Sequence, residues 1–265
     1  MLELRHVSCR YYDRFVLKDI NVRIEDGDLV GVIGPNGSGK TTLIRAVTRA
    51  IKLAEGEVLL KGKPLGMFGF KELAQQVAVV GRLYDLDVQM KVEDLVLLGR
   101  IPHKRGLQLM ERRSDMDIAR RAMELTGTLS LKDRFVDSLS SGERQLAFIA
   151  RSLAQEPELL LLDEPTSHLD ITHQARVLDL VRKLNRDKGL TVLVVLHDLN
   201  LASQYCDRLF LLGDGALRKD GTPDEVLAYQ TIEEVYHTPV VVMKNPVSSR
   251  PCVFLVPEDA IAGVK

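Results

Sequence analysis

The stretch Gly34-Pro35-Asn36-Gly37-Ser38-Gly39-Lys40-Thr41-Thr42 decides how the rest of this sequence is interpreted. It has the pattern G-x-x-x-x-G-K-[ST], which is typical of a loop that binds phosphate groups. The apolar run before it, residues 29–33, is typical of a buried parallel strand. After it, apolar residues recur at helical spacing, at Leu43, Ala46, Val47, Ala50 and Ile51. The pattern therefore predicts a strand, a phosphate-binding loop and a helix in succession. The alternative is a glycine-rich turn that matches by chance.

Each part of this loop suits a nucleotide. Where a strand ends and a helix begins, the first N–H groups have no partner and the helix dipole is positive, so a phosphate chain is favoured. Gly34, Gly37 and Gly39 allow the backbone to turn tightly and approach the phosphate oxygens. Lys40 can reach the β and γ phosphates, and the Thr41 hydroxyl can bind Mg²⁺. The loop predicts nucleotide binding without saying how the nucleotide is used.

The charge balance argues against a nucleic-acid partner. Among 265 residues, 36 are Lys or Arg and 37 are Asp or Glu, so the formal net charge is −1. Binding dominated by neutralised phosphates is not expected from such a chain. Basic pairs occur at 104–105, 112–113 and 120–121, but acidic residues are interleaved between them, which is typical of a solvated helix face.

The cysteines and the apolar runs indicate where the protein works. Cys9, Cys206 and Cys252 are isolated and lack the spacing of metal ligands, which fits a reducing cytoplasm. The first residues show no signal-peptide pattern, and no apolar run approaches the roughly 18 residues that a membrane span needs. We expect that, if the protein serves a membrane, it does so from outside the bilayer.

Local patterns predict strands at both ends of the chain and helices between them. Alternating Ile20, Val22 and Ile24 predict a half-buried strand, and further strands are expected at residues 58–60, 77–80, 159–162, 191–196 and 209–212. From about Val92 to Ala154 the β-branched runs vanish and leucines recur at helical spacing, which predicts a mostly helical insertion. The end of the chain carries prolines among valines, which predicts a tail of short strands.

A pair of carboxylates, Asp163-Glu164, follows directly on the predicted strand 159–162. In a protein with a phosphate loop, Asp163 can take part in holding Mg²⁺, and Glu164 can polarise a water for attack on the γ-phosphate. The alternative is an acidic capping region that opens the next helix.

His197 ends the next apolar strand and is followed by Asp198. Ligands of α/β sheets lie beyond the carboxyl ends of the strands, so this histidine is a candidate for contact with the γ-phosphate and the attacking water. The alternative is a helix-capping or solvated histidine.

The segment Leu139-Ser140-Ser141-Gly142-Glu143 lies just before a predicted helix. It favours the catalytic roles of the carboxylate pair and of His197 over their capping or solvated alternatives. With the other motifs it resembles the ATP-binding-cassette ATPases of ABC transporters, over essentially the whole chain. The family's markers stand in order: the phosphate loop, this signature, the acidic strand end, the D-loop at residues 167–170 and the switch histidine His197.

The resemblance implies a site shared by two subunits. In this family two cassettes dimerise head to tail, and each ATP lies between the phosphate loop of one and the signature of the other. Ser140, Ser141, Gly142 and Glu143 would then belong to the partner's ATP site, and Asp170 would organise the dimer contact.

The adenine ring has two candidate partners. Tyr11 matches the aromatic residue that stacks on adenine in this family, and the adjacent Tyr12 is its competitor. We prefer Tyr11. Both could instead be surface aromatics at a strand end.

Two positions depart from the family pattern. The third signature position is usually glycine and is Ser141 here, which retains a small residue. The position after Gly81 is usually a glutamine that contacts the metal and the attacking water, but here it is Arg82. Arginine has no acceptor and cannot bind Mg²⁺. Arg82 could instead pair with phosphate, or it could point away from the site, and we favour the second alternative. The usual coupling role of this segment is therefore in question.

We expect an α/β fold: an ABC-type nucleotide-binding domain with a RecA-like phosphate-loop core, an N-terminal antiparallel β part and an inserted helical subdomain. A single domain would cover residues 1–265, with its core at 1–82 and 156–220, the helical subdomain at 83–155 and a tail at 221–265.

The expected function is ATP hydrolysis, with ATP and Mg²⁺, at a head-to-tail dimer that powers an ABC importer. Residues 166–174, 197–200, 221–223 and 245–247 resemble the ATPases of importers for iron–siderophore, haem or cobalamin. The partners would be a second copy of the chain and an integral membrane permease, with a substrate-binding protein involved only indirectly. The location would be cytoplasmic, on the inner face of the cell membrane. The alternative is a soluble cassette that acts as a cytosolic assembly factor without a membrane subunit.

Overall fold

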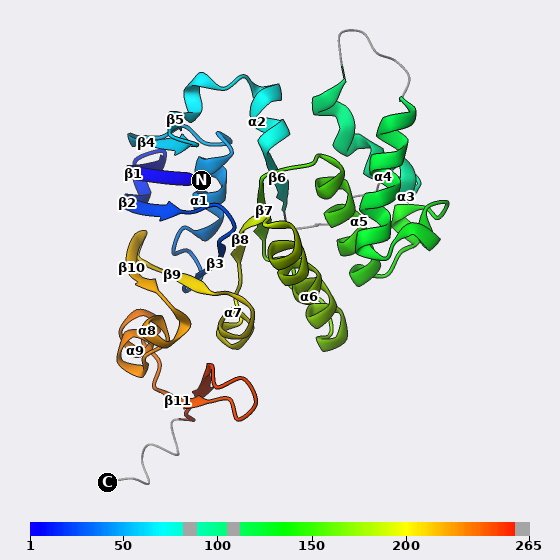
Figure 1. Cartoon of the computed structure of the whole chain (residues 1–265). Helices are drawn as coiled ribbons and strands as arrows, with labels where there is room; N and C mark the ends of the chain where they lie inside the picture. The colour runs from blue at the N-terminus through cyan, green and yellow to red at the C-terminus, as the bar shows by residue number, and fades with distance from the viewer. Residues whose placement is uncertain (82–88, 105–111, 258–265) are drawn as a thin grey trace, which may run out of the picture. The chain divides into compact units, whose positions relative to one another are not determined.

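The predicted strand, loop and helix are present in the computed structural model of the protein. Strand β3 (Leu29–Ile33) leads into the phosphate loop, and helix α1 (Lys40–Val47) follows it (Figure 1). The structure describes residues 1–81, 89–104 and 112–257. By their contacts these residues form two units. Unit 1 comprises Met1–Pro64 and the chain from Leu193 onward, and unit 2 comprises Leu65–Val192.

Helix α1 is shorter than its apolar pattern predicted. It ends at Val47, Thr48 caps it, and Arg49 takes a left-handed backbone with φ 57°. A left-handed residue just after a helix ends the helical hydrogen bonding. Ala50 and Ile51 were expected to continue the helix, but they lie in the turn that follows it.

The antiparallel β part predicted at the N-terminus is a four-stranded sheet of unit 1. Its order is β2-β1-β4-β5, seen in blue and cyan in Figure 1. The strands are β1 (Leu2–Tyr11), β2 (Arg14–Ile24), β4 (Glu55–Leu60) and β5 (Lys63–Pro64). Ile20, Val22 and Ile24 are buried on one face of β2, as their alternation predicted.

A second sheet in unit 1 carries the phosphate loop. Strand β9 (Arg208–Gly213) runs parallel to β3, and β10 (Ala216–Gly221) pairs antiparallel with β9 to form a hairpin. Strand β8 (Thr191–Val195) crosses from unit 2 into unit 1, and just beyond it the Leu196 N–H donates to the carbonyl of Val32 at 3.1 Å. All five residues of β3 are buried, so the loop starts from a rigid strand.

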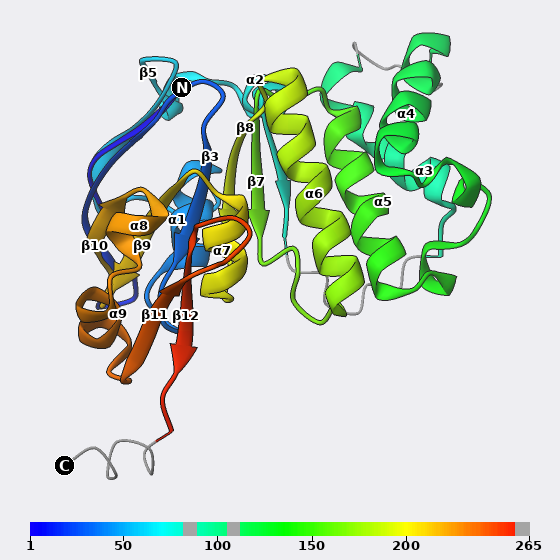
Figure 2. The ribbon, with the colours of Figure 1, turned by 60° about the horizontal axis from the view of Figure 1, so that its bottom comes forward.

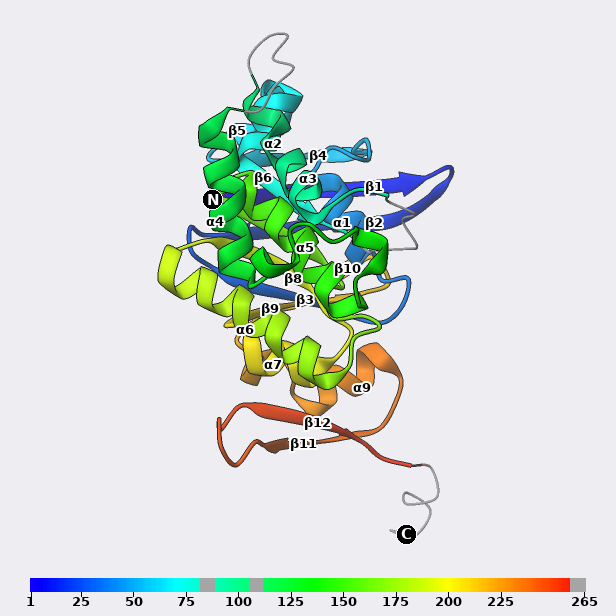
Figure 3. The same cartoon turned by 90° about the vertical axis from the view of Figure 1, so that its right-hand side faces the viewer.

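The tail of unit 1 contains helices that the sequence did not predict. Helices α8 (Pro223–Val226) and α9 (Tyr229–Tyr236) precede the hairpin of β11 (Val240–Lys244) and β12 (Pro251–Leu255) (Figure 3). The hairpin is tied to helix α7 (Leu199–Tyr205), because Asn200 exchanges two hydrogen bonds with the backbone of Val253, at 2.7 and 3.1 Å. The short strands were predicted correctly, but α9 was missed.

Unit 2 combines two parallel strands with helices, as Figure 2 shows. Strand β6 (Val77–Val80) pairs in parallel with β7 (Leu159–Asp163). The helices are α2 (Phe70–Gln76), α3 (Val92–Leu97), α4 (Arg113–Thr126), α5 (Ser141–Ala154) and α6 (Ile171–Lys188). Short 3₁₀ turns are η1 (Leu65–Met67), η2 (Leu98–His103), η3 (Leu129–Leu131) and η4 (Val136–Ser138). Between Val92 and Ala154 the described residues form helices and turns, which confirms the helical insertion.

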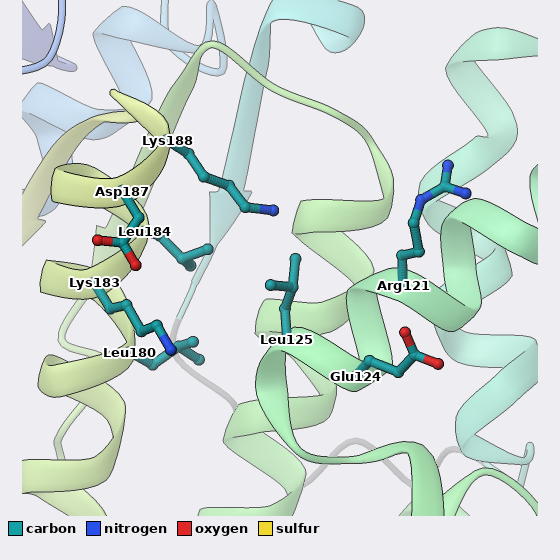
Figure 4. A pocket seen from close by; sticks show the side chains of 8 residues that line it. All are labelled: Arg121, Glu124, Leu125, Leu180, Lys183, Leu184, Asp187 and Lys188. Atoms are coloured by element: carbon teal, nitrogen blue, oxygen red, sulfur yellow. The ribbon is translucent and has the colours of Figure 1, made fainter.

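A cavity of about 390 Å³ opens between α4 and α6 of unit 2 (Figure 4). Leu125, Leu180 and Leu184 contribute its apolar surface, and charged side chains such as Arg121 and Lys188 surround them. The cavity is lined by the C-terminal halves of the two helices. The signature at the start of α5 and the D-loop residue at the start of α6 do not line it.

A buried ion pair joins the helices of unit 2. Arg100 and Asp115 are only 5% and 6% exposed, and the Arg100 Nε donates to Asp115 Oδ1 at 3.0 Å. The Arg100 guanidinium also donates to the Ala154 carbonyl at 2.6 Å and to Glu156 at 2.8 Å. One cation thus connects η2, the first turn of α4 and the end of α5.

Replacing Arg100 by methionine tests this connection. Arg100→Met keeps most of the side-chain volume but leaves Asp115 buried without its cation, so the free energy of unfolding should fall by about 3–5 kcal/mol. Chemical denaturation measures the change. The matched control is Arg120→Met on α4, which removes an exposed pair with Glu124 and should cost less than about 1 kcal/mol. Equal losses in the two variants would contradict the assigned role of Arg100.

Candidate functional site

The backbone of the phosphate loop has the conformation that its glycines predicted. Gly34, Gly37 and Gly39 have φ values of 146°, 80° and 103°, which side chains disfavour. A Cβ on Gly34 would lie 2.2 Å from the Leu212 carbonyl oxygen, and one on Gly39 would lie 2.5 Å from Leu17 Cδ2. Gly34 and Gly39 are therefore required both by the turn and by the close packing of β9 and β2 against it, whereas Gly37 is required by its backbone conformation alone.

Two polar side chains face the inside of this loop. The Lys40 ammonium is buried and donates to the carbonyls of Gly34 and Pro35, at 2.7 and 2.9 Å. The Ser38 hydroxyl oxygen is buried and has no hydrogen-bond partner among the residues that the structure describes. Buried polar atoms are normally paired. An ammonium and an unpaired hydroxyl in a glycine-rich cradle are the donors that a phosphate chain needs, so the residues fit this ligand.

The first glycine of the loop has a partner that no sequence motif indicated. Tyr236, at the end of α9, is hydrogen bonded to the backbone of Gly34. Burial raises the pKa of the Tyr236 phenol above its usual range, and the hydrogen bond with Gly34 acts in the opposite direction. The tail helix thus braces the point where β3 turns into the loop. A lone tyrosine 202 positions along the chain gives no sequence signal of such a contact.

The two candidate adenine partners differ in their surroundings. Tyr11 ends β1, is half-buried, and its hydroxyl accepts a hydrogen bond from Arg45 on α1 at 2.8 Å. Tyr12 lies in the turn after it and is 96% exposed. Tyr11 is therefore held next to the helix that follows the phosphate loop, whereas Tyr12 is not.

The predicted carboxylate pair lies at the carboxyl end of β7 in unit 2. Asp163 and Glu164 are only 5% and 7% exposed. Glu164 has a left-handed backbone with φ 56°, which costs energy for a residue with a side chain and occurs most often at functional sites. The Ser167 hydroxyl donates to Glu164 Oε2 at 3.3 Å. The acidic capping role considered for this pair does not apply, because Asp170 caps the helix that follows.

The signature opens helix α5 with reciprocal hydrogen bonds. Ser140 is the N-cap residue, and its hydroxyl oxygen accepts from the Glu143 N–H at 3.3 Å. The Ser140 N–H donates to the Glu143 carboxylate at 2.9 Å, and Arg134 lies 3.6 Å from the other carboxylate oxygen. The bonds from Ser140 lower the pKa of Glu143. This capping box fixes the backbone of Ser141 and Gly142 in the first turn.

The D-loop and the switch histidine occupy comparable positions, each just before a helix. The Asp170 carboxylate accepts from the His173 N–H at 2.9 Å and so caps α6. His197 follows β8 and is exposed. Asp198, and not His197, caps α7, because its carboxylate accepts from the N–H groups of Asn200 and Leu201 at 2.7 and 3.0 Å. The helix-capping alternative for His197 is therefore wrong.

The predicted site residues divide between the two units. Unit 1 holds the phosphate loop, Tyr11 and His197, and unit 2 holds Asp163, Glu164, the signature and Asp170. Arg82 lies outside the described residues. No group of three or more potential metal-binding side chains occurs within the described residues.

The sequence profile described as "ABC transporter" matches residues 17–167, which is more than half of the chain. The chain belongs to the ABC transporter family. As a member of that family it is an ATPase.

Named relatives resemble this ABC ATPase over most of their length. It is 40% identical to the petrobactin import ATP-binding protein FpuC of Bacillus anthracis, over 89% of this chain and 86% of that protein. It is 40% identical to the ferric enterobactin transport ATP-binding protein FepC of Escherichia coli, over 90% and 88% of the two chains. The hemin import ATP-binding protein HmuV of Gloeobacter violaceus is also 40% identical, over 93% and 90%.

Solved structures share the fold. An ABC transporter of metal-chelate type in an inward-facing conformation matches with a TM-score of 0.85 and 25% identity, over 97% of this chain and 98% of that one. The dimeric cassette MJ0796 bound to ADP and phosphate matches with a TM-score of 0.73 and 28% identity, over 84% and 98%. These matches confirm the predicted fold of an ATP-binding cassette. Within the described ranges, no helix of this ABC ATPase is long and apolar enough to cross a membrane.

The role of Lys40 in holding phosphate is directly testable. Lys40→Ala removes the buried ammonium, and the loss of charge-assisted hydrogen bonds should weaken ATP binding by about 10- to 100-fold. Equilibrium binding of a fluorescent ATP analogue measures this. Lys52→Ala, an exposed lysine in the loop that follows α1, is the control and should leave the affinity unchanged. An affinity that survives in Lys40→Ala would contradict the assignment of the loop.

Proposed function

We propose that this chain is the ATP-hydrolysing subunit of an ABC importer for a metal chelate of the iron–siderophore, haem or cobalamin type. The observation that carries the proposal is the 40% identity to import ATP-binding proteins over about nine-tenths of the chain. The partners would be a second copy of the chain and an integral membrane permease, and a substrate-binding protein would act only indirectly. The chain would lie in the cytoplasm, on the inner face of the membrane.

Hydrolysis would use the two carboxylates in different roles. Glu164 would act as the general base that takes a proton from the water attacking the γ-phosphate, and its burial favours this proton transfer. Thr41 and Asp163 would hold Mg²⁺, which supplies charge neutralisation at the phosphates when bound. His197 would donate a hydrogen bond to the γ-phosphate and hold the attacking water. Its exposure leaves it accessible to such a ligand.

A second subunit would complete each ATP site. Ser140, Ser141, Gly142 and Glu143 would face the partner's γ-phosphate, together with the positive end of the α5 dipole. The capping box supports this role for Ser140. It holds Ser140 at the start of α5, where the N-terminus of the helix favours an anion. Asp170 is an exposed cap at the start of α6, where it could organise the contact between subunits.

Adenine would stack on Tyr11. A ring held through Arg45 next to α1 needs little further ordering to receive a base. Since stacking uses the face of the base and not its edge, selection among bases should be loose.

The division of the chain follows the same proposal. Residues 1–82 and 156–220 would form the nucleotide-binding core, 83–155 the helical subdomain and 221–265 the tail. Arg82 would not bind Mg²⁺ in place of the usual glutamine, because a guanidinium has no acceptor.

The alternative is a soluble cassette that acts as an assembly factor. The names of the relatives, which are import proteins, favour the importer. Affinity purification of the tagged chain from detergent-solubilised membranes separates the two. A helical membrane subunit should be recovered in stoichiometric amount, and its repeated absence would favour the assembly factor.

The Glu164→Gln variant tests the assigned base. The amide keeps the shape of the side chain but cannot take a proton, so hydrolysis should fall at least about 100-fold while ATP binding persists. The dimer should then accumulate with ATP, which size-exclusion chromatography detects. Hydrolysis within about threefold of the parent protein would rule out Glu164 as the base.

The Ser140→Arg variant tests the shared site. A long cation at the N-cap of α5 should block the approach of the partner's nucleotide, so turnover should be lost. ATP binding by the monomer should change by less than about twofold, because Ser140 does not belong to the subunit's own phosphate loop. Parallel assays of binding and phosphate release distinguish these effects, and unchanged turnover would count against a two-subunit site.

A further inference from the structure

His173, in the first turn of α6, occupies a position that neither the family motifs nor helix capping explains. Its backbone N–H makes the ordinary capping bond to Asp170. In addition, its ring Nδ1 lies 2.9 Å from each of the two oxygens of the same carboxylate. The ring is therefore held in a fixed orientation by the D-loop residue. These bonds also lower the pKa of Asp170, which keeps the carboxylate ionised as their acceptor.

The other side of the same ring lies on the signature. A Cβ on Gly142 would be 2.0 Å from the His173 Cδ2, 2.5 Å from its Cγ and 2.8 Å from its Nε2. Real side chains do not approach so closely, so this ring occupies the space that any other residue at position 142 would need. Gly142 is helical and does not have a positive φ. Its lack of a side chain is thus required by the contact with His173 and not by its backbone angles.

Two acidic groups lie close to the ring. Asp170 from the start of α6 and Glu143 from the first turn of α5 are the acidic groups near it, and His173 contributes to the lowered pKa of Glu143. Arg134 pairs with Glu143 on its far side. The N-termini of both helices meet at this ring, and each presents N–H groups that suit an anion.

We propose that His173 is a positioning residue that fixes the D-loop and the signature relative to each other. This inference rests on the proposed two-subunit ATP site, in which both segments face the partner subunit. A single ring bound to Asp170 and packed on Gly142 makes the two segments one rigid surface. When two copies of the chain associate around ATP, the D-loop and the signature are therefore already held in place relative to each other. Preorganisation of this kind strengthens association without adding a contact to the nucleotide.

Variants at position 173 distinguish the two interactions of the His173 side chain, which are its hydrogen bonds to Asp170 and its packing on Gly142. The capping bond of α6 comes from the backbone N–H, so every substitution keeps it. His173→Ala removes both the ring contact and the side-chain bond. His173→Phe keeps a ring beside Gly142 but has no donor for Asp170. His173→Asn keeps an N–H at the place of Nδ1 and atoms at the places of Cγ and Cδ2, so it is the conservative variant.

The experiment measures ATP-dependent dimerisation in the Glu164→Gln background by sedimentation velocity, with binding of a fluorescent ATP analogue to the monomer as a parallel readout. His173→Ala and His173→Phe should raise the dimer dissociation constant about tenfold or more, as expected when a hydrogen bond to a charged group is lost. His173→Asn should remain within about threefold of the parent. Monomer affinity for ATP should be unchanged in all three. With Glu164 restored, His173→Ala should lower kcat.

The matched control is His103→Ala. His103 is also a partly buried histidine of unit 2, and its Nε2 is hydrogen bonded to the Gln155 carbonyl at 2.9 Å. Gln155 is the C-cap of α5, at the opposite end of that helix from the signature, so His103→Ala should not change dimerisation.

The outcomes are distinguishable. If the Glu164→Gln parent does not dimerise with ATP, the proposed function fails. If the parent dimerises and His173→Ala does so equally well, the positioning role is wrong. The role is also overturned if His173→Ala weakens ATP binding by the monomer, or if His103→Ala weakens the dimer to the same extent.

Discussion

The left-handed backbone of the phosphate loop is the constraint on which unit 1 depends. Gly34 and Gly39 leave no room for side chains, because the Leu212 carbonyl and Leu17 pack directly against them. The strands β2 and β9 therefore close around the turn, and Tyr236 from the tail braces its first residue. This packing fixes the shape of the loop around the Lys40 ammonium and the unpaired Ser38 hydroxyl. The loop is thus a preformed cradle.

Under the proposed function, unit 2 would contribute a different kind of anion site. Helices α5 and α6 each begin with a side-chain cap, Ser140 and Asp170, and His173 lies between the two beginnings. A side-chain cap pairs only some of the N–H groups at a helix N-terminus. The remaining N–H groups can bind phosphate. The buried Arg100 ion pair connects η2 and α4 to the end of α5, the helix that begins with the signature. The same unit supplies the strained Glu164 at the end of β7.

The sequence predicted the elements better than the contacts between them. Runs such as residues 159–162 and 191–196 were recognised as strands because buried parallel strands are continuously apolar. The end of α1 was missed because Arg49 is left-handed, and nothing in an arginine indicates that. The positive φ of Glu164 and the hydrogen bond between the Gly34 backbone and Tyr236 depend on tertiary packing. The contact of His173 with Gly142 joins segments 31 positions apart, so no local pattern could indicate it.

The central claim is that the phosphate loop of one copy works with the signature of another, and a mixing experiment tests it most directly. Lys40→Ala lacks a working phosphate loop, and Ser140→Arg lacks a working signature. In a mixed head-to-tail dimer, one of the two sites combines the intact loop of the second variant with the intact signature of the first. Two preparations that are inactive alone should therefore regain up to roughly a quarter of normal ATP hydrolysis when mixed, since about half the dimers are mixed. If phosphate release stays at the level of the separate variants at every mixing ratio, the shared site is wrong.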